Sequence, residues 1–468
     1  MRRLPGPAPA DPGPAALAAT AAAELSEQDP ELYRLLADDL RARTATLDLV
    51  AATSLAPPSV LACAGSALSD VTAEGYPGAR LHAGCAVVDQ IERLAVARAT
   101  AVFRAEYANV QPSSGSAANL SVYFGLLEPG DTILGLDVDC GGHPTHGALT
   151  SVTGRYFTPV SYGLNAAGRI DYARVHALAE RFRPKLIVCG GPAYPRVPDF
   201  AAFRRIADEV GAFLLADISA VAGLVAAGAH PSPIDHAHVT TASTRAQLCG
   251  PRGGLILLGA DADSPVPGTH TTLRRQLRRA VYPIAQTAPD PAAIAATARA
   301  LSYVATPEFR RVAASITAGA RAMAARLVEL DHDVLTGGTD NHLVLMNAMA
   351  SGMTGYVAEQ ALEACGILVS RTRIPWDVKP ARLGSGIRFG SVGLALRGLA
   401  SRDMVRCVDL VHTVLRSVTA RSDTDYVLPD QVRQRVSSAV RELSAAHPVP
   451  GHPTAPAGLG WGPVAAAS

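Results

Sequence analysis

Short apolar runs alternate with stretches of helical spacing over much of this chain. Thr132–Leu136, Lys185–Val188 and Gly254–Leu258 are apolar runs of strand length, and the apolar residues of Phe200–Val210 recur as they do on one face of a helix. Alternating strands and helices are typical of βαβ units, which build a mostly parallel sheet. The segment from about 59 to 300 therefore predicts an α/β fold.

The same pattern divides the rest of the chain. Glu31–Leu49 has leucines on one helical face, and beyond residue 300 a long helix around Pro307–Leu330 precedes short strands near His342–Met346. Proline and alanine dominate the first residues, and proline, glycine and alanine the last. We therefore expect five segments: a disordered extension (1–27), an N-terminal helical arm (28–58), a large α/β domain (59–300), a small C-terminal α/β domain (301–446) and a disordered tail (447–468).

Composition narrows the class of protein and its partners. Hydrophobic residues make up 48% of the chain and charged residues 18%, as in globular proteins. The formal net charge is +1 with both signs interspersed, so neither nucleic acid nor a membrane surface is an expected partner. No apolar run approaches the roughly 20 residues that span a bilayer. Prolines interrupt the start where a secretory signal would be apolar, and the seven cysteines form no C-x-x-C pair. We expect a cytoplasmic protein with reduced thiols and no metal site.

Two groups of polar residues follow predicted strands, where ligands bind in open α/β sheets. Ser114-Gly115-Ser116 precedes a helical run, and such a small-residue turn either holds an anion or is an ordinary helix cap. Asp217 ends the apolar run Phe213–Ala216. A carboxylate at this point needs hydrogen bonds or a cationic partner, such as a protonated ring nitrogen.

A histidine and an arginine are further candidates. Gly141-Gly142-His143 places an imidazole on a flexible loop, where it either stacks on a planar ligand or serves a structural role. Arg388 follows Ser385-Gly386-Ile387 and is able to clamp a carboxylate through two parallel hydrogen bonds, although surface arginines are more common than such clamps. Taken singly, each assignment stays open.

Longer motifs resemble one enzyme family. They include Ala73-Glu74-Gly75-Tyr76-Pro77-Gly78, Leu126-Leu127-Glu128-Pro129-Gly130-Asp131-Thr132, Gly141-Gly142-His143 with Thr145-His146-Gly147, and Gly250-Pro251-Arg252-Gly253-Gly254. From about 30 to 420 the chain resembles serine hydroxymethyltransferase, a fold-type-I enzyme that uses pyridoxal phosphate. The resemblance implies an aminotransferase-like fold with a mostly parallel seven-stranded sheet in the large domain and a smaller C-terminal α/β domain. It also implies glycine and serine chemistry with tetrahydrofolate.

The resemblance implies roles for individual residues as well. Family members are obligate dimers or tetramers of dimers, so we expect a homodimer whose subunits complete each other's pockets. By motif, Ser114, Gly115 and Ser116 match part of the phosphate cup, Asp217 the carboxylate on the pyridine nitrogen, His143 the histidine stacked on the cofactor ring, Arg388 the arginine on the substrate carboxylate, and Glu74 the acid/base glutamate donated by the partner; His82 stands where the family has a substrate-side tyrosine.

The family's cofactor-binding lysine has no counterpart here. The family motif T-H-K-T-L-A-G-P-R-G-G corresponds to Thr244–Gly254, in which Ala246 occupies the Schiff-base lysine position. Of the 42 lysine and arginine residues only Lys185 and Lys379 are lysine, and a general preference for arginine does not explain an alanine. Arg245, beside it, either supplies a new phosphate contact or is a solvated or structural arginine.

Other departures surround the same pocket. Because there are several of them, they are not explained by a single engineered change of lysine to alanine. They indicate that the pocket was remodelled naturally. Relative to the family, the chain has Ala52 and Pro192 for serines, Thr72 and His82 for tyrosines, Ala220 for a histidine, Thr372 for an asparagine, and Tyr282–Pro289 for a glycine-rich phosphate-binding segment.

Three functions remain open. Alanine has no nucleophile, so we expect pyridoxal phosphate to bind without a covalent link if it binds, with tetrahydrofolate as a further candidate ligand. The kept pocket residues Glu74, His143, Asp217 and Arg388 favour a diverged transferase or aldolase-like enzyme with another amino-acid-like substrate. The lost lysine favours an inactive paralogue that forms a heterodimer with an active hydroxymethyltransferase and gives Glu74 to its site. An ordinary hydroxymethyltransferase that works without the lysine is the third.

Overall fold

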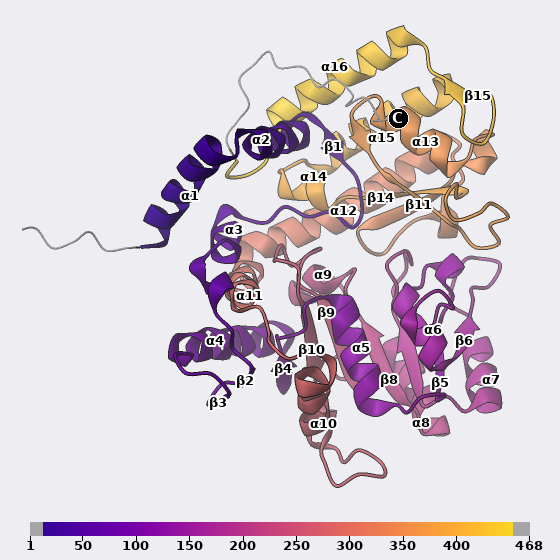
Figure 1. Cartoon of the computed structure of the whole chain (residues 1–468). Coiled ribbons are helices and arrows are strands. Elements are labelled where there is room, and N and C mark those ends of the chain that lie inside the picture. The colour runs from indigo at the N-terminus through magenta and orange to yellow at the C-terminus, as the bar shows by residue number, and fades with distance from the viewer. Residues whose placement is uncertain (1–12, 453–468) are drawn as a thin grey trace, which may run out of the picture.

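A seven-stranded sheet forms the centre of the larger domain in the computed structural model, which describes residues 13–452 (Figure 1). Strand β10 runs antiparallel to both neighbours and the other pairs are parallel, which confirms the predicted α/β fold with a mostly parallel sheet. In spatial order the strands are β4 (Tyr107–Asn109), β10 (Gly254–Leu258), β9 (Val239–Ser243), β8 (Phe213–Asp217), β7 (Leu186–Cys189), β5 (Thr132–Leu136) and β6 (Thr158–Tyr162).

Helices cover both faces of this sheet, which is why its strands are apolar along most of their length. In β8, Leu214 packs with residues of α7 and α8 whereas Leu215 packs with residues of α5 and α10, because successive side chains of a strand point to opposite faces. The helices of this part are α4 (Ala86–Phe103), α5 (Gly115–Leu126), α6 (Val152–Tyr156), α7 (Tyr172–Phe182), α8 (Phe200–Val210), α9 (Ala222–Ala226), α10 (Leu273–Arg279) and α11 (Pro291–Val304).

The C-terminal part, orange to yellow in Figure 1, lies above the large sheet in that view. Its antiparallel sheet has the order β11 (Leu343–Asn347), β14 (Gly386–Gly390), β13 (Ser370–Thr372). The long helices α12 and α15 bury Ile316, Met323 and Val411 in one shared core. Helices of this part are α12 (Pro307–Glu329), α13 (Gly355–Glu363), α14 (Val392–Leu396), α15 (Ser401–Ser417) and α16 (Asp430–Ala446).

Two helices precede the first strand, namely α1 (Pro14–Gln28) and α2 (Pro30–Ala45). The expectation of disorder for residues 1–27 is therefore wrong from Pro14 onward. A proline at the first helical position and the alanines that follow favour a helix, although α1 buries none of its side chains. Of the tail expected to be disordered, residues 453–468 lie outside the described part, as do residues 1–12, whereas Val449 is buried.

Short elements complete the described chain. Strand β1 (Leu47–Asp48) pairs in parallel with β12 (Ile367–Leu368). The others are helix α3 (Pro58–Ala64), the hairpin of β2 (Gly75–Tyr76) and β3 (Ala79–Arg80), and the antiparallel pair of β15 (Thr419–Ala420) and β16 (Tyr426–Val427).

No helix among residues 13–452 is both long and apolar enough to cross a membrane.

The buried guanidinium of Arg397 fastens the N-terminal arm to the last helix. It donates to the carbonyls of Thr44 and Thr46 at the end of α2, at 3.3 and 2.7 Å, and to those of Ser444 and His447 at the end of α16, at 2.9 and 2.7 Å. The last carbonyls of a helix have no partner within the helix, so one side chain satisfies two helix ends at once.

Replacing Arg397 with methionine is expected to lower the free energy of unfolding by about 3 kcal/mol, because four carbonyls lose a charged donor. Urea unfolding followed by circular dichroism measures this loss. Arg402→Met is the control, since the Arg402 side chain is 89% exposed. Equal stability of the two variants would contradict the role given to Arg397.

Candidate active site

A cavity of about 210 Å³ opens at the carboxyl ends of the parallel strands. Its wall brings together six of the residues selected from the sequence: Ser114, Gly115, Ser116, His143, Asp217 and Arg245. The departures Pro192 and Ala220 also line it, whereas Glu74, His82 and Arg388 do not. Sequence reasoning therefore located the pocket but not every residue on its wall.

Asp217 is the most constrained group of the cavity. One carboxylate oxygen, Oδ2, accepts hydrogen bonds from Asn119 Nδ2 at 2.8 Å and from His146 Nε2 at 3.1 Å, and Oδ1 accepts one from the Ser219 amide at 2.9 Å. Burial alone would raise the pKa of Asp217, but the contacts with His146, Ser219 and Asn119 outweigh burial and hold the pKa below its usual value. The carboxylate is therefore ionised at neutral pH, although only 9% of the residue is exposed.

The partners of Asp217 are themselves fixed. The His143 amide donates to His146 Nδ1 at 3.4 Å, so the remaining ring proton sits on Nε2, which faces Asp217. Asn119 is held from both sides, because its Nδ2 also donates to Thr145 Oγ1 and its Oδ1 accepts from Thr241 Oγ1 at 2.6 Å. This network joins α5, β8, β9 and the loop after β5.

Sequence reasoning missed Asn119 and His146 as members of the site. His146 was quoted within a motif but received no role, and Asn119 lies in a helix that otherwise buries small and apolar side chains. A polar residue in such a stretch is a usable signal, because buried polar groups need partners.

The N-terminus of α5 forms the second side of the cavity. Ser114 caps this helix, since its Oγ accepts from the Ala117 amide at 3.0 Å. Gly115 is required by close packing, because a Cβ there would lie 2.9 Å from Ser219 Oγ and 3.3 Å from Ser243 Cβ. Helix capping and anion binding are compatible here, since a helix start carries partial positive charge on several free amides.

His143 lies half-buried in the cavity wall. Its Nδ1 is 2.8 Å from Thr145 Oγ1. Burial lowers the pKa of His143, and the neighbouring His146 lowers it further, against the opposing effect of Asp217. The ring is therefore neutral at pH values where a free histidine would begin to gain a proton.

Arg388 reaches the edge of the site from β14 of the small domain. Its Nη1 donates to the carbonyl of Pro192 at 3.0 Å, and Pro192 lines the cavity. Its Nε is buried and has no hydrogen-bond partner among the described residues, and burial lowers the pKa of the guanidinium. An unsatisfied buried N–H on a cation fits a carboxylate ligand.

The remaining predicted residues lie elsewhere. Glu74 immediately precedes the β2–β3 hairpin and His82 is an exposed residue after it. Ala246 lies in the turn after β9, next to the exposed Arg245.

The donors present fit a pyridoxal-type group only in part. A buried ionised carboxylate suits a protonated ring nitrogen, and the α5 N-terminus suits a phosphate. Neither of the two lysines lines the cavity, however. Lys185 lies directly before β7, at the amino end of the sheet, and Lys379 Nζ pairs with Asp423 at 2.8 and 2.9 Å. The site therefore suits such a group held without a covalent link and offers no lysine for a Schiff base.

A mostly parallel seven-stranded sheet with a helix start and a buried aspartate at the carboxyl ends of its strands is consistent with the fold-type-I class of proteins. Comparison with known proteins gives the family. The family model described as "Serine hydroxymethyltransferase" matches residues 25–411. The chain belongs to the serine hydroxymethyltransferase family, whose members typically use pyridoxal phosphate and tetrahydrofolate.

Individual relatives match over nearly their whole length. A serine hydroxymethyltransferase of Paramagnetospirillum magneticum is 40% identical over 420 residues, which cover 90% of this chain and 96% of that protein. One of Rhodospirillum centenum is 41% identical over 426 residues, which cover 91% and 96%. The overall expectation of a serine hydroxymethyltransferase-like protein is thereby confirmed.

Asp217→Asn is expected to lower the free energy of unfolding by about 2 kcal/mol at neutral pH. The carboxylate accepts three hydrogen bonds, and a neutral amide oxygen accepts hydrogen bonds less strongly than a carboxylate oxygen does. The pKa of Asp217 is lower in the folded protein than in the unfolded chain. The stabilisation that its carboxylate provides is therefore fully present above the unfolded pKa of about 3.9 and is lost as pH falls through the folded pKa. Urea unfolding of both proteins across this range should show the difference shrinking with acid. A difference that stays constant would mean that the carboxylate charge is not involved.

Proposed function

We propose that this chain is a diverged transferase or aldolase-like enzyme that binds pyridoxal phosphate and an amino-acid-like substrate without a covalent link to the protein. The observation that carries the proposal is the complete network around Asp217 in a chain that has Ala246 where the family motif has its lysine. A pocket that had lost all ligands would gain nothing from a buried, ionised carboxylate, which costs free energy to bury.

Each remaining residue would hold one part of the ligand. When bound, pyridoxal phosphate supplies an electron sink for bonds to the α-carbon of an amino acid. Asp217 would accept the ring N–H, and His143 would stack on the ring. The α5 N-terminus and the Arg245 guanidinium would hold the phosphate, and the free Nε of Arg388 would bind the substrate carboxylate.

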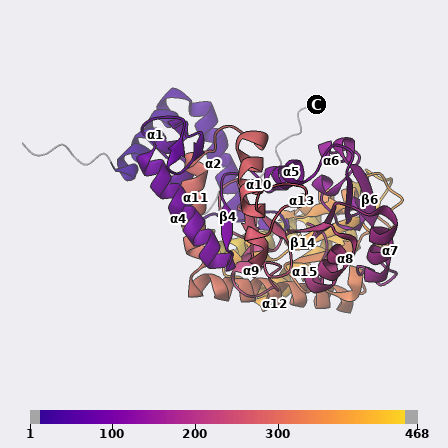
Figure 2. The same ribbon diagram turned by 90° about the horizontal axis from the view of Figure 1, so that it is seen from below.

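Glu74 would act in a neighbouring subunit, so the proposal includes a homodimer. Exposed apolar side chains on the N-terminal helices support a partner surface. Leu32, Leu35 and Leu36 lie on one face of α2, and Val87 and Leu94 are two turns apart on α4. Helices α1, α2 and α4 lie on the same side of the molecule in both views (Figures 1 and 2). A cytoplasmic location goes with this proposal, supported by seven cysteines that are all free thiols.

An inactive paralogue in a heterodimer is the second candidate. It is favoured by the position of Glu74 outside its own cavity, since the chain would then supply a partner's site while its own lacks the lysine. Affinity purification followed by mass spectrometry separates the candidates. Co-purification with an active hydroxymethyltransferase supports the heterodimer, and a stable homodimer without such a chain counts against it.

Purified protein mixed with pyridoxal phosphate and glycine is expected to keep a pyridoxal absorbance band through rapid gel filtration, which removes free ligand, and to lose it on prolonged dialysis because no covalent link forms. An absorbance scan before and after dialysis measures both effects. The matched control is Asp217→Ala, which removes the ring contact. Absence of any band on the protein after gel filtration would exclude every pyridoxal-dependent version of this proposal.

Ala246→Lys alone is not expected to restore the serine cleavage rate of the relatives. The wall also differs at Pro192, Ala220 and Arg245, so we expect a shortfall of about tenfold or more, equivalent to about 1.4 kcal/mol of transition-state binding. Ala246→Met, which adds similar length without an amine, is the control for cavity filling. Full recovery in the lysine variant would show that the other departures are neutral.

A further inference from the structure

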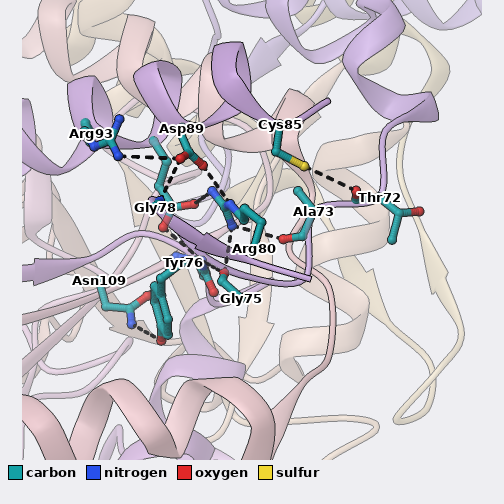
Figure 3. Close-up of polar contacts among 12 residues, drawn as sticks. Thr72, Ala73, Gly75, Tyr76, Gly78, Arg80, Cys85, Asp89, Arg93 and Asn109 are labelled. Carbon is teal, nitrogen blue, oxygen red and sulfur yellow. Dashed lines mark hydrogen bonds and ion pairs between the residues drawn. The ribbon is translucent and has the colours of Figure 1, made fainter. Parts of the chain in front are cut away.

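The chain segment that carries Glu74 is held by an unusual set of backbone contacts (Figure 3). Four consecutive carbonyls, from Thr72 to Gly75, are all hydrogen-bonded. The Thr72 carbonyl accepts a weak bond from the Cys85 thiol, the Glu74 carbonyl accepts from the Leu81 amide at 3.1 Å, and the other two accept from Arg80. The backbone on both sides of Glu74 is therefore fixed.

Arg80 is the centre of this arrangement. Its side chain is only 4% exposed, and Nη1 donates to the carbonyls of Ala73 and Gly75 at 3.0 and 2.7 Å. Its other nitrogens bind two carboxylates of α4, Asp89 at 2.9 Å and Glu92 at 2.6 Å. One guanidinium thus ties the residues flanking Glu74 to a long helix.

Neighbouring groups complete the network. Asp89 also accepts from the Gly78 amide at 2.7 Å, and Gln111 Nε2 donates to the Gly75 carbonyl and to Glu92. Buried ion pairs of this kind add little net stability, because desolvation offsets their attraction, but they favour one conformation over others. Gly75 adds a steric constraint, since its φ is +91° and a Cβ there would lie 2.4 Å from the Ala79 carbonyl.

The Glu74 carboxylate itself takes no part in the network. Among residues 13–452 it has no hydrogen bond and no ion pair, and it does not line the cavity of its own chain. Tyr76, two residues on, is anchored separately through its hydroxyl to the Arg278 carbonyl at 2.7 Å. The segment therefore presents one unengaged carboxylate from a rigid frame.

We propose that Arg80 is a positioning residue for Glu74, fixing the backbone so that the Glu74 carboxylate is held ready for the pocket of a second subunit. This rests on the proposed function, in which Glu74 serves that pocket. The donor fork of arginine is needed because two carbonyls and two carboxylates must be reached together, a geometry that lysine does not offer.

A double-mutant cycle in the full-length protein tests the functional part. Tetrahydrofolate affinity is measured by calorimetry with pyridoxal phosphate and glycine present, for the wild type, Glu74→Gln, Arg80→Met and the double variant. We expect each single change to weaken binding about tenfold, and the double variant to be no weaker than Glu74→Gln, because Arg80 acts through Glu74. Arg80→Lys should be intermediate. If the loss of affinity in the double variant equals the product of the two single losses, Arg80 and Glu74 act independently, and the proposal is overturned.

Hydrogen exchange followed by mass spectrometry gives a second, ligand-free readout. In Arg80→Met, amides of residues 72–82 should exchange faster while β5 and β8 stay protected, and Arg402→Met, whose side chain is 89% exposed and has no contact with this network, should change neither. If the Arg80→Met protein does not fold, the same measurement is made on Arg80→Lys. Unchanged exchange in the Arg80 variant overturns the proposal. If the wild type binds no tetrahydrofolate, exchange alone decides the positioning role, and the absorbance test of pyridoxal binding decides the proposed function separately.

Discussion

The buried, ionised carboxylate of Asp217 is the constraint on which the rest of the site depends. A lone carboxylate at this depth would take up a proton, so the fold must supply donors from several directions. It does so with Asn119 from α5, His146 from the loop after β5, and the Ser219 amide after β8. Through Asn119 and Thr241 the same network reaches β9, the strand that leads to Ala246. The hydrogen bonds that stabilise the Asp217 carboxylate therefore set the geometry of the cavity before any ligand binds.

Under the proposed function, the lack of a covalent tether changes how such a pocket would be occupied. A Schiff base keeps a cofactor in place regardless of its free concentration, whereas a ligand held by hydrogen bonds stabilises the protein only in proportion to RT ln(1 + [L]/Kd). The positively charged parts of the cavity wall are Arg245, Arg252 and the start of α5. Occupancy would then follow the supply of ligand, and release would need no chemical step.

Much of this arrangement is predictable from the sequence, and the exceptions have physical causes. Asp217 was found because it ends an apolar run, and Ser114 because small polar residues precede a helix. Asn119 was missed because its partner lies 98 residues away, and no spacing rule connects them. The helix α1 was taken for disorder because proline content outweighed the helix propensity of alanine. Pairings between distant segments, not local preferences, are what the sequence leaves hidden.

Under the proposed function, the chain carries two halves of an active site that do not meet within one chain. The Asp217 network would hold the ring, and the Arg80 network would hold the segment that bears Glu74. Each half is built from contacts inside the chain, so neither needs the lysine position to keep its shape. Substitution at that position was therefore compatible with retention of both halves. Under the proposed function, the two halves meet only when a second subunit brings its Glu74 segment to the cavity, so the chemistry depends on that pairing as much as on the missing lysine.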